Sequence, residues 1–194
     1  MAVIHCEPGV QEKIWNKSEY YRLGELGFFR GQRVELIEGR LMISSPQSAL
    51  HADTVDRVDD TLSALFPPGY FVRCQLPIDL GQIIEPEPDI AVVVGRTRQF
   101  QRAHPTSAEL IVEVSESSLD YDRLNKGSLY ARAGVADYWI INLVDSQVEV
   151  YRNPIPDSTQ PHGWRYDTRA DLTPPATLVP LVLPTAVAVA DLLP

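Results

Sequence analysis

Residues 88–94 read Pro-Asp-Ile-Ala-Val-Val-Val, and residues 109–115 read Glu-Leu-Ile-Val-Glu-Val-Ser. Both runs are rich in β-branched residues and are apolar at nearly every position, which is typical of central strands buried on both faces. Each run nevertheless carries an acid, Asp89 at the head of the first and Glu113 inside the second. Carboxylates are rarely left in such an apolar setting unless a positive partner meets them. The two runs therefore predict both the centre of the fold and the place of its chemistry.

The relative placement of the two acids follows from strand geometry. Side chains alternate along a strand, so Ile111, Glu113 and Ser115 share one face. If the two strands pair antiparallel, Asp89 at the head of one lies near Glu113 at the end of the other. Both carboxylates could then bind one hard divalent cation, because Mg²⁺ takes few carboxylates and keeps several waters. The alternative is that Asp89 caps a turn after Pro88 and that Glu113 pairs with a surface arginine.

A helix is predicted over residues 119–133. Asp122, Lys126 and Tyr130 lie four residues apart within it, so they form one stripe of the helix surface. If that stripe faces the sheet, Lys126 would orient an attacking water or stabilise charge on phosphorus. The alternative is an ordinary surface salt bridge between Asp122 and Lys126.

The flanking segments complete the predicted order of elements. The pattern predicts an N-terminal hairpin over residues 34–44 with its turn at Gly39-Arg40, a helix from about 48 to 66, and a strand over 70–80. After the helix over 119–133 come strands at 136–143, 147–151 and 164–168. The predicted class is α/β, with a core of helix, three strands, helix and strand, an N-terminal hairpin and extra C-terminal strands.

Four segments together carry a family resemblance. They are Pro-Asp-Ile-Ala-Val-Val, Val-Glu-Val-Ser-Glu-Ser-Ser, Tyr-Asp-Arg-Leu-Asn-Lys and Leu-Tyr-Ala-Arg-Ala-Gly-Val-Ala-Asp-Tyr-Trp-Ile-Ile-Asn, in that order. In this combination the chain resembles the Uma-two family of restriction endonucleases, which belongs to the PD-(D/E)XK nuclease superfamily. The resemblance covers roughly residues 15 to 152 and continues weakly to the end. It implies a restriction endonuclease-like fold, in a single domain over residues 1–194.

The resemblance also implies a function. The expected activity is that of a metal-dependent endonuclease hydrolysing DNA phosphodiester bonds, with Mg²⁺ or Mn²⁺ as cofactor and a homodimer as the working form. Asp89, Glu113 and the main-chain carbonyl of Val114 are the implied metal ligands. The superfamily pattern Glu-x-Lys reads Glu113-Val-Ser115 here, so the strand lysine is missing. Lys126 on the following helix fits as the relocated catalytic lysine.

Two rival functions are compatible with the same residues. One is a catalytically silent module that keeps the nuclease fold and binds nucleic acid or protein. The other is a hydrolase of small phosphoesters, with a closed pocket in place of an open groove.

Two further residues are candidates for the catalytic site. Glu38 ends a predicted strand before Gly39, and it is either a member of the site or a turn residue. His51 begins a predicted helix after a Ser-Pro pair. It could hydrogen-bond a metal-bound water or the scissile phosphate, and the alternative is a histidine on the helix surface.

The charge balance limits how DNA could be bound. The chain has 17 Lys and Arg against 26 Asp and Glu, a net charge of −9. Phosphate contacts supply most of the affinity for DNA, so this balance argues against strong non-specific binding. The basic cluster is the loop at residues 95–107, with Arg96, Arg98 and Arg102. It is either a solvated loop or an arm that contacts phosphates. As an arm it is expected on the same side of the sheet as the metal site, because it directly follows the strand headed by Asp89.

Cysteine usage and apolar segments bear on the compartment. Cys6 and Cys74 provide neither a disulfide framework nor a metal-binding spacing. The first residues lack the basic start and apolar run of a signal peptide, and no membrane span is expected. These features predict a cytoplasmic protein.

Overall fold

The computed structural model describes residues 11–194, and this part of the chain divides into two compact units. The first unit comprises the described residues up to Ser45 together with Leu80–Pro86. The second unit comprises Pro46–Asp79 and Glu87–Pro194. Cys6 lies outside the described residues. The assignment of the whole chain to a single domain stays a prediction.

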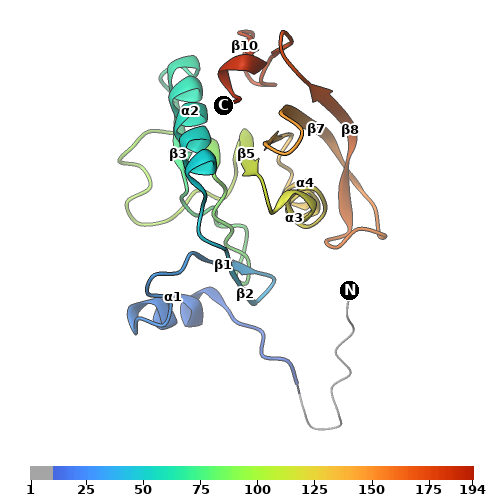
Figure 1. The fold of residues 1–194 in the computed structure, drawn as a ribbon. Coiled ribbons are helices and arrows are strands. Elements are labelled where there is room, and N and C mark those ends of the chain that lie inside the picture. Colours follow the sequence, from blue (N-terminus) through green and yellow to red (C-terminus); the bar gives the residue numbers. More distant parts are fainter. Residues whose placement is uncertain (1–10) are drawn as a thin grey trace. The chain divides into compact units, whose positions relative to one another are not determined.

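The first unit contains one helix and the predicted hairpin (Figure 1). Its elements are α1 (Lys17–Glu25), β1 (Val34–Ile37) and β2 (Arg40–Ile43). Ile37 pairs with Arg40, so the turn is Glu38-Gly39 and not the predicted Gly39-Arg40. Both turn residues have positive φ, 50° and 72°, as a two-residue hairpin turn of the primed type requires.

The second unit is built on a six-stranded sheet in the order β3-β4-β5-β6-β7-β8. The strands are β3 (Tyr70–Cys74), β4 (Ile90–Val94), β5 (Leu110–Ser115), β6 (Asp137–Asn142), β7 (Gln147–Pro156) and β8 (Trp164–Leu172). Only the β5–β6 pair is parallel within this sheet, and a helical crossover connects those two strands, as parallel pairing requires. The predicted core of helix, three strands, helix and strand is therefore confirmed.

The predicted strand over 70–80 is too long, because β3 already ends at Cys74. Gln75 follows with a φ of 51°, which lies in the left-handed region and cannot continue a strand. The predicted strands over 147–151 and 164–168 are both too short, since β7 extends to Pro156 and β8 pairs with it as far as Leu172.

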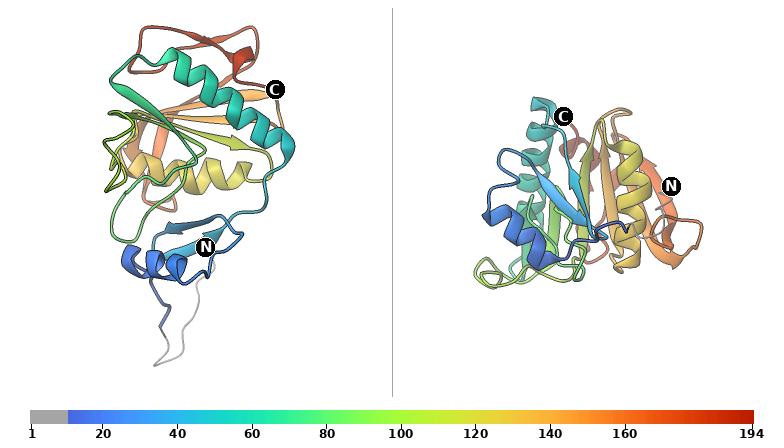
Figure 2. Two further views of the ribbon diagram at one scale, coloured as in Figure 1. Left: turned by 90° about the vertical axis from the view of Figure 1, so that its left-hand side faces the viewer. Right: turned by 90° about the horizontal axis from the view of Figure 1, so that it is seen from below.

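Helices cover the two faces of this sheet (Figures 1 and 2). One face presents Ile90, Val92, Leu110, Val112 and Val114 to a core that contains helix α2 (Ala49–Leu65). The C-terminal segment adds β9 (Thr177–Leu178), β10 (Val187–Ala188) and the 3₁₀-helix η2 (Val189–Asp191) to the same core. Because side chains alternate, Asp89 and Glu113 lie on the opposite face, beneath the helices that follow β5.

The predicted helix over 119–133 is not one regular α-helix. It consists of α3 (Leu119–Tyr121), a π-helical turn η1 (Asp122–Lys126) and α4 (Gly127–Arg132). The Gly127 N–H donates to the Asp122 carbonyl five residues earlier, and the Tyr138 hydroxyl donates to the same oxygen at 3.0 Å. Single π-turns inside α-helices are rare and are frequent at functional sites. This π-turn ends at Lys126, the predicted catalytic lysine.

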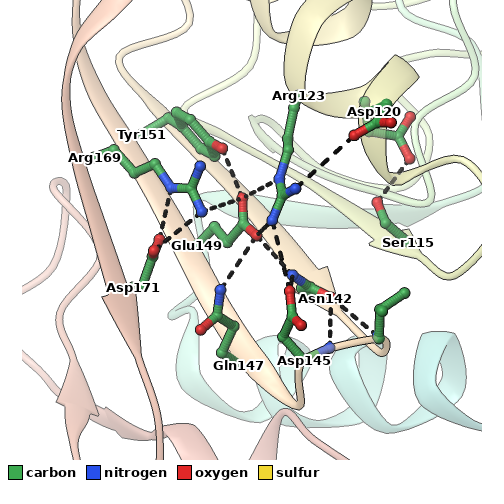
Figure 3. Close-up of polar contacts among 12 residues, drawn as sticks. Ser115, Asp120, Arg123, Asn142, Asp145, Gln147, Glu149, Tyr151, Arg169 and Asp171 are labelled. Carbon is green, nitrogen blue, oxygen red and sulfur yellow. Dashed lines mark hydrogen bonds and ion pairs between the residues drawn. The ribbon is translucent and has the colours of Figure 1, made fainter.

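A buried carboxylate connects η1 to β7 (Figure 3). Glu149 is 0% exposed and accepts two hydrogen bonds from Arg123, at 3.0 Å from Nε and 2.5 Å from Nη2. The Tyr151 hydroxyl donates to it at 2.6 Å and the Asn142 amide at 2.7 Å, while Arg169 lies at 3.3 Å. Burial alone would raise the pKa of Glu149, but these donors and charges outweigh it and lower the pKa to about 2.

This lowered pKa predicts a pH-dependent contribution to stability. The ordinary value is 4.5 and the folded value is about 2, a difference worth at most about 3 kcal/mol and less where solvent screens the charges. A depressed carboxyl pKa stabilises the fold fully above about pH 4.5, and this stabilisation is lost as the pH falls toward 2. In urea unfolding, Glu149→Gln should therefore be less stable than wild type at about pH 7, and the gap should narrow steadily below about pH 4.5.

Asp171→Asn is the matched control, because Asp171 lies at the half-exposed rim of the same cluster and contacts Arg169. An exposed ion pair contributes little, so this variant should follow wild type at every pH. A constant gap between wild type and Glu149→Gln from about pH 7 to about pH 2.5 would contradict the assignment.

Candidate metal and catalytic centre

The two acids of the central strands lie side by side. β4 pairs antiparallel with β5, with Ile90 opposite Val112, so the head of β4 adjoins the end of β5. Asp89 is 4% exposed and Glu113 is 2% exposed. The Val114 N–H donates to Asp89 Oδ2 at 3.0 Å, and the Asp89 N–H donates to Glu113 Oε2 at 3.4 Å. The antiparallel pairing that a shared cation needs is present.

The strand register also accounts for the proline before Asp89. Continuing the β4–β5 register by two residues from Ile90 and Val112 would place Pro88 opposite Val114. The carbonyl of Val114 points to the same side as its N–H, that is, toward the head of β4. Proline has no N–H to donate to that carbonyl. The Val114 carbonyl oxygen therefore accepts no hydrogen bond from the residue opposite it in the sheet, and it lies beside the two carboxylates.

The helix after β5 directs two side chains onto Glu113. Lys126 Nζ donates to Glu113 Oε1 at 3.0 Å, and the Tyr130 hydroxyl donates to the same oxygen at 2.7 Å. Lys126 and Tyr130 are both buried, so Lys126 does not form the surface salt bridge considered as the alternative. Glu113 likewise pairs with this lysine and tyrosine and not with a surface arginine. The catalytic roles themselves stay predictions.

Asp122 is a third buried acid, and the sequence did not single it out as a site residue. Its Oδ2 accepts hydrogen bonds from the hydroxyls of Ser115 at 2.7 Å and Ser118 at 2.5 Å. Burial raises the pKa of Asp122. The charge of Lys126 and the hydrogen bonds from the two hydroxyls oppose that rise, whereas the negative charge of Asp89 adds to it. Ser115 occupies the position at which the superfamily pattern has lysine, and here its hydroxyl donates a hydrogen bond to Asp122. The four-residue spacing of Asp122 and Lys126 was the signal in the sequence that placed Asp122 on the same helix face as the lysine.

His51 approaches the site from the start of α2. Its Nε2 lies 3.6 Å from Asp89 Oδ1, and its side chain is 15% exposed. The Ser48 hydroxyl caps the helix by accepting from the His51 N–H at 3.1 Å. Gln75 donates to the same Asp89 oxygen at 3.3 Å, so two side chains bracket the outer edge of this carboxylate. The role of His51 in the catalytic site stays a prediction.

Glu38 occupies a different setting. It is the first residue of the β1–β2 turn, in the first compact unit, whereas the other candidate residues lie in the second unit. Its positive φ agrees with the turn residue that the sequence allowed as the alternative. Its membership of the catalytic site stays a prediction.

The donor set fits a hard divalent cation. Asp89, Glu113 and the Val114 carbonyl offer oxygen ligands only, which suits Mg²⁺ and Mn²⁺ and not the softer transition metals. Within residues 11–194, no group of three or more His, Cys, Asp and Glu side chains is arranged to hold a metal. A cation at this site would therefore depend on the main-chain oxygen and on water for its remaining ligands, as Mg²⁺ commonly does.

Comparison with known proteins supplies the family. The family model described as "Uma2: Putative restriction endonuclease" matches residues 18–188. The chain belongs to the Uma2 family. The predicted resemblance is thus confirmed, and membership of Uma2 supports a nuclease. No match to the chain is found among curated proteins.

A solved structure supports the fold. The crystal structure of "a putative nuclease belonging to DUF820 from Anabaena variabilis ATCC 29413" superposes with a TM-score of 0.59 at 16% sequence identity. The match covers 82% of this chain and 88% of that one. The restriction endonuclease-like fold predicted from the sequence is therefore confirmed. Among the described residues, no helix is long and apolar enough to cross a membrane.

Metal binding can be tested through stability. A cation that binds only the folded chain raises its free energy of unfolding, by about 2.7 kcal/mol at about one hundred times Kd. We predict that Mn²⁺ raises the melting temperature of wild type, and that Asp89→Asn and Glu113→Gln abolish the rise. Each replacement keeps one of the two carboxylate oxygens, so asparagine at position 89 can still accept from the Val114 N–H, and glutamine at position 113 can still accept from Lys126 and Tyr130.

Glu109→Gln is the control, because Glu109 lies just before β5 and outside the acid pair. It should respond to Mn²⁺ like wild type. If Asp89→Asn combined with Glu113→Gln still gave the wild-type rise, the cation would be bound elsewhere.

Proposed function

We propose that the chain is a metal-dependent endonuclease that hydrolyses phosphodiester bonds of DNA. The observation that carries the proposal is the contact of Lys126 Nζ with Glu113 at 3.0 Å, directly beside Asp89. Two buried carboxylates with a buried ammonium form a set that stabilises both a divalent cation and the negative charge of a reacting phosphate. Membership of the Uma2 family supports the same reaction class.

Each residue of the site receives a role in this proposal. Asp89, Glu113 and the Val114 carbonyl would hold Mg²⁺ or Mn²⁺, which when bound supplies positive charge against the charge that develops on the phosphate. Lys126 orients the attacking water or neutralises a phosphate oxygen. Tyr130 holds the Glu113 carboxylate in place. His51 donates a hydrogen bond to the phosphate on the outer side of Asp89.

The basic loop between β4 and β5 is proposed to bind DNA backbone phosphates. Its Phe100 stacks on Phe71 with ring centroids 6.4 Å apart, and the Arg73 guanidinium lies 5.2 Å from the centre of the Phe100 ring. Phe71 and Arg73 pair with Val93 and Ala91, so the loop covers the sheet face that carries Asp89. This agrees with the side expected from the sequence.

The loop nevertheless leaves from the far end of β4. Six residue-to-residue steps along the strand separate Asp89 from Gly95, or about 20 Å. That length corresponds to about six base pairs of DNA. Arg96, Arg98 and Arg102 lie in this loop and are all exposed, so the loop can contact phosphates that flank the cleavage point and not the scissile one.

A catalytically silent binding module is the second candidate, favoured by the net charge of −9. It would keep metal binding at Asp89 and Glu113 without cleavage of nucleic acid. A hydrolase of small phosphoesters and a homodimeric state stay predictions from the sequence.

Cleavage by Lys126→Met tests the proposed catalytic lysine. Methionine keeps most of the apolar stem and removes only the ammonium. Loss of one charge that stabilises the transition state costs about 10²–10³-fold in kcat. We expect this loss in Mn²⁺-supported cleavage of plasmid DNA, with the Mn²⁺-induced rise in melting temperature retained.

Arg57→Met serves as the control, because Arg57 is an exposed cation on α2. It should cleave like wild type. Unchanged cleavage by Lys126→Met would remove the lysine from the mechanism, and absence of cleavage by wild type on DNA and RNA would favour the silent module.

The role of the basic loop predicts a change in salt dependence. Replacing Arg96, Arg98 and Arg102 by glutamine removes three phosphate contacts, so the slope of log K against log salt should fall in magnitude by up to about 3. Cleavage of bound DNA should change little, since these residues position the duplex and do not react. The measurement is a series of filter-binding titrations from about 50 to about 200 mM salt. Equal slopes for the triple variant and wild type would make the loop a plain solvated connection.

A further inference from the structure

The π-turn that carries Lys126 is attached to three adjacent strands of the sheet. Asp122 accepts hydrogen bonds from Ser115 of β5, and its carbonyl accepts one from Tyr138 of β6. Arg123 forms the third attachment, to Glu149 of β7. The first two are single hydrogen bonds from hydroxyl groups. The third is a bidentate, charge-assisted pair with a fully buried carboxylate, the strongest type of the three.

The direction of Lys126 depends on the register of this turn. A π-turn holds one more residue than an α-helical turn, and each residue of an α-helix turns the side chain by about 100°. If η1 relaxed to α-helical geometry while α3 stayed in place, Lys126 would rotate by about this angle away from Glu113. Because π-helical geometry is rare, it needs anchors on both sides of the extra residue. Arg123 anchors the first half, and Lys126 and Tyr130 anchor the second half on Glu113.

We propose that Arg123 and Glu149 are positioning residues for Lys126. They hold the π-turn in the register that brings the ammonium to Glu113, and they act through the turn and not through contact with the reacting groups. The catalytic consequence rests on the proposed function. The position of the ammonium does not, so the two can be tested separately.

The same cluster provides a matched comparison. Arg169 of β8 also contacts Glu149, at 3.3 Å (Figure 3). It also pairs with Asp171 at 2.7 Å, and its guanidinium lies 5.6 Å from the centre of the Tyr151 ring. Removing Arg169 takes one arginine from the carboxylate without touching η1. Arg123→Gln and Arg169→Gln therefore weaken the same buried charge, but only Arg123→Gln detaches the helix.

The first measurement uses the full chain without metal. The Lys126 ammonium is buried and hydrogen-bonded, so its ¹⁵N–¹H signal should be protected from exchange with water, and Lys126→Met assigns it. We expect Arg169→Gln to keep this signal at its wild-type position and Arg123→Gln to lose or shift it. Arg123→Lys, which keeps the charge but not the bidentate geometry, should restore it in part.

The second measurement is Mn²⁺-supported cleavage. A displacement of about 1 Å in a reacting group can cost about 100-fold, so we expect that loss in kcat for Arg123→Gln. KM should change much less, and Arg169→Gln should stay within about threefold of wild type in kcat. If Arg123→Gln does not fold, the comparison is made between Arg123→Lys and Arg169→Lys.

The proposal is overturned if Arg123→Gln keeps the wild-type ammonium signal, or if Arg169→Gln disturbs the signal as much as Arg123→Gln does. The latter result would make the cluster a general contribution to stability. If wild type cleaves no nucleic acid, the proposed function fails, and the ammonium signal still decides whether Arg123 positions Lys126.

Discussion

The hydrogen bond from the Lys126 ammonium to the Glu113 carboxylate is the interaction on which the centre of this structure depends. Two carboxylates, Asp89 and Glu113, are buried where β4 meets β5, and each would destabilise an apolar interior if left alone. The lysine offsets one charge, and the backbone N–H of Val114 binds the other acid. The remaining negative charge is what makes this place suitable for a divalent cation.

The helix that carries this lysine departs from regular α-helical geometry. The parallel pairing of β5 with β6 requires a crossover helix, and the helix must reach back over the strand it has just left. A regular α-helix would not present Arg123 to β7 and Lys126 to β5 in the observed way. The π-turn does so, and the buried Glu149 is the side chain that stabilises it from β7.

Much of this arrangement could be predicted from the sequence, because the signals were strong and local. The apolar runs that contain Asp89 and Glu113 indicated two central strands, and the four-residue spacing of Lys126 and Tyr130 indicated the helix face that meets them. The π-turn could not be predicted in the same way. The turn is stabilised by tertiary contacts of Arg123 and Asp122 with neighbouring strands. The spacing of apolar residues predicts a helix but does not indicate such contacts.

The site residues that the sequence missed, Asp122 and Ser115, share this origin, since their bond joins a helix and a strand. The end of β3 was missed because Gln75 adopts a left-handed backbone conformation without being glycine or asparagine. The basic loop covers the face of the sheet that was expected. A loop that follows a strand starts at the end opposite to the strand's head, so it begins away from Asp89.

Asp89 and Glu113 are proposed to bind a divalent cation beside Lys126. The most direct measurement is a crystal structure of the full chain grown with Mn²⁺, with the metal located by its anomalous scattering. We expect one Mn²⁺ with oxygen ligands at about 2.1 Å from Asp89, Glu113 and the Val114 carbonyl. An anomalous map with no peak at the acid pair at saturating Mn²⁺, or with the only strong peak elsewhere, would contradict it.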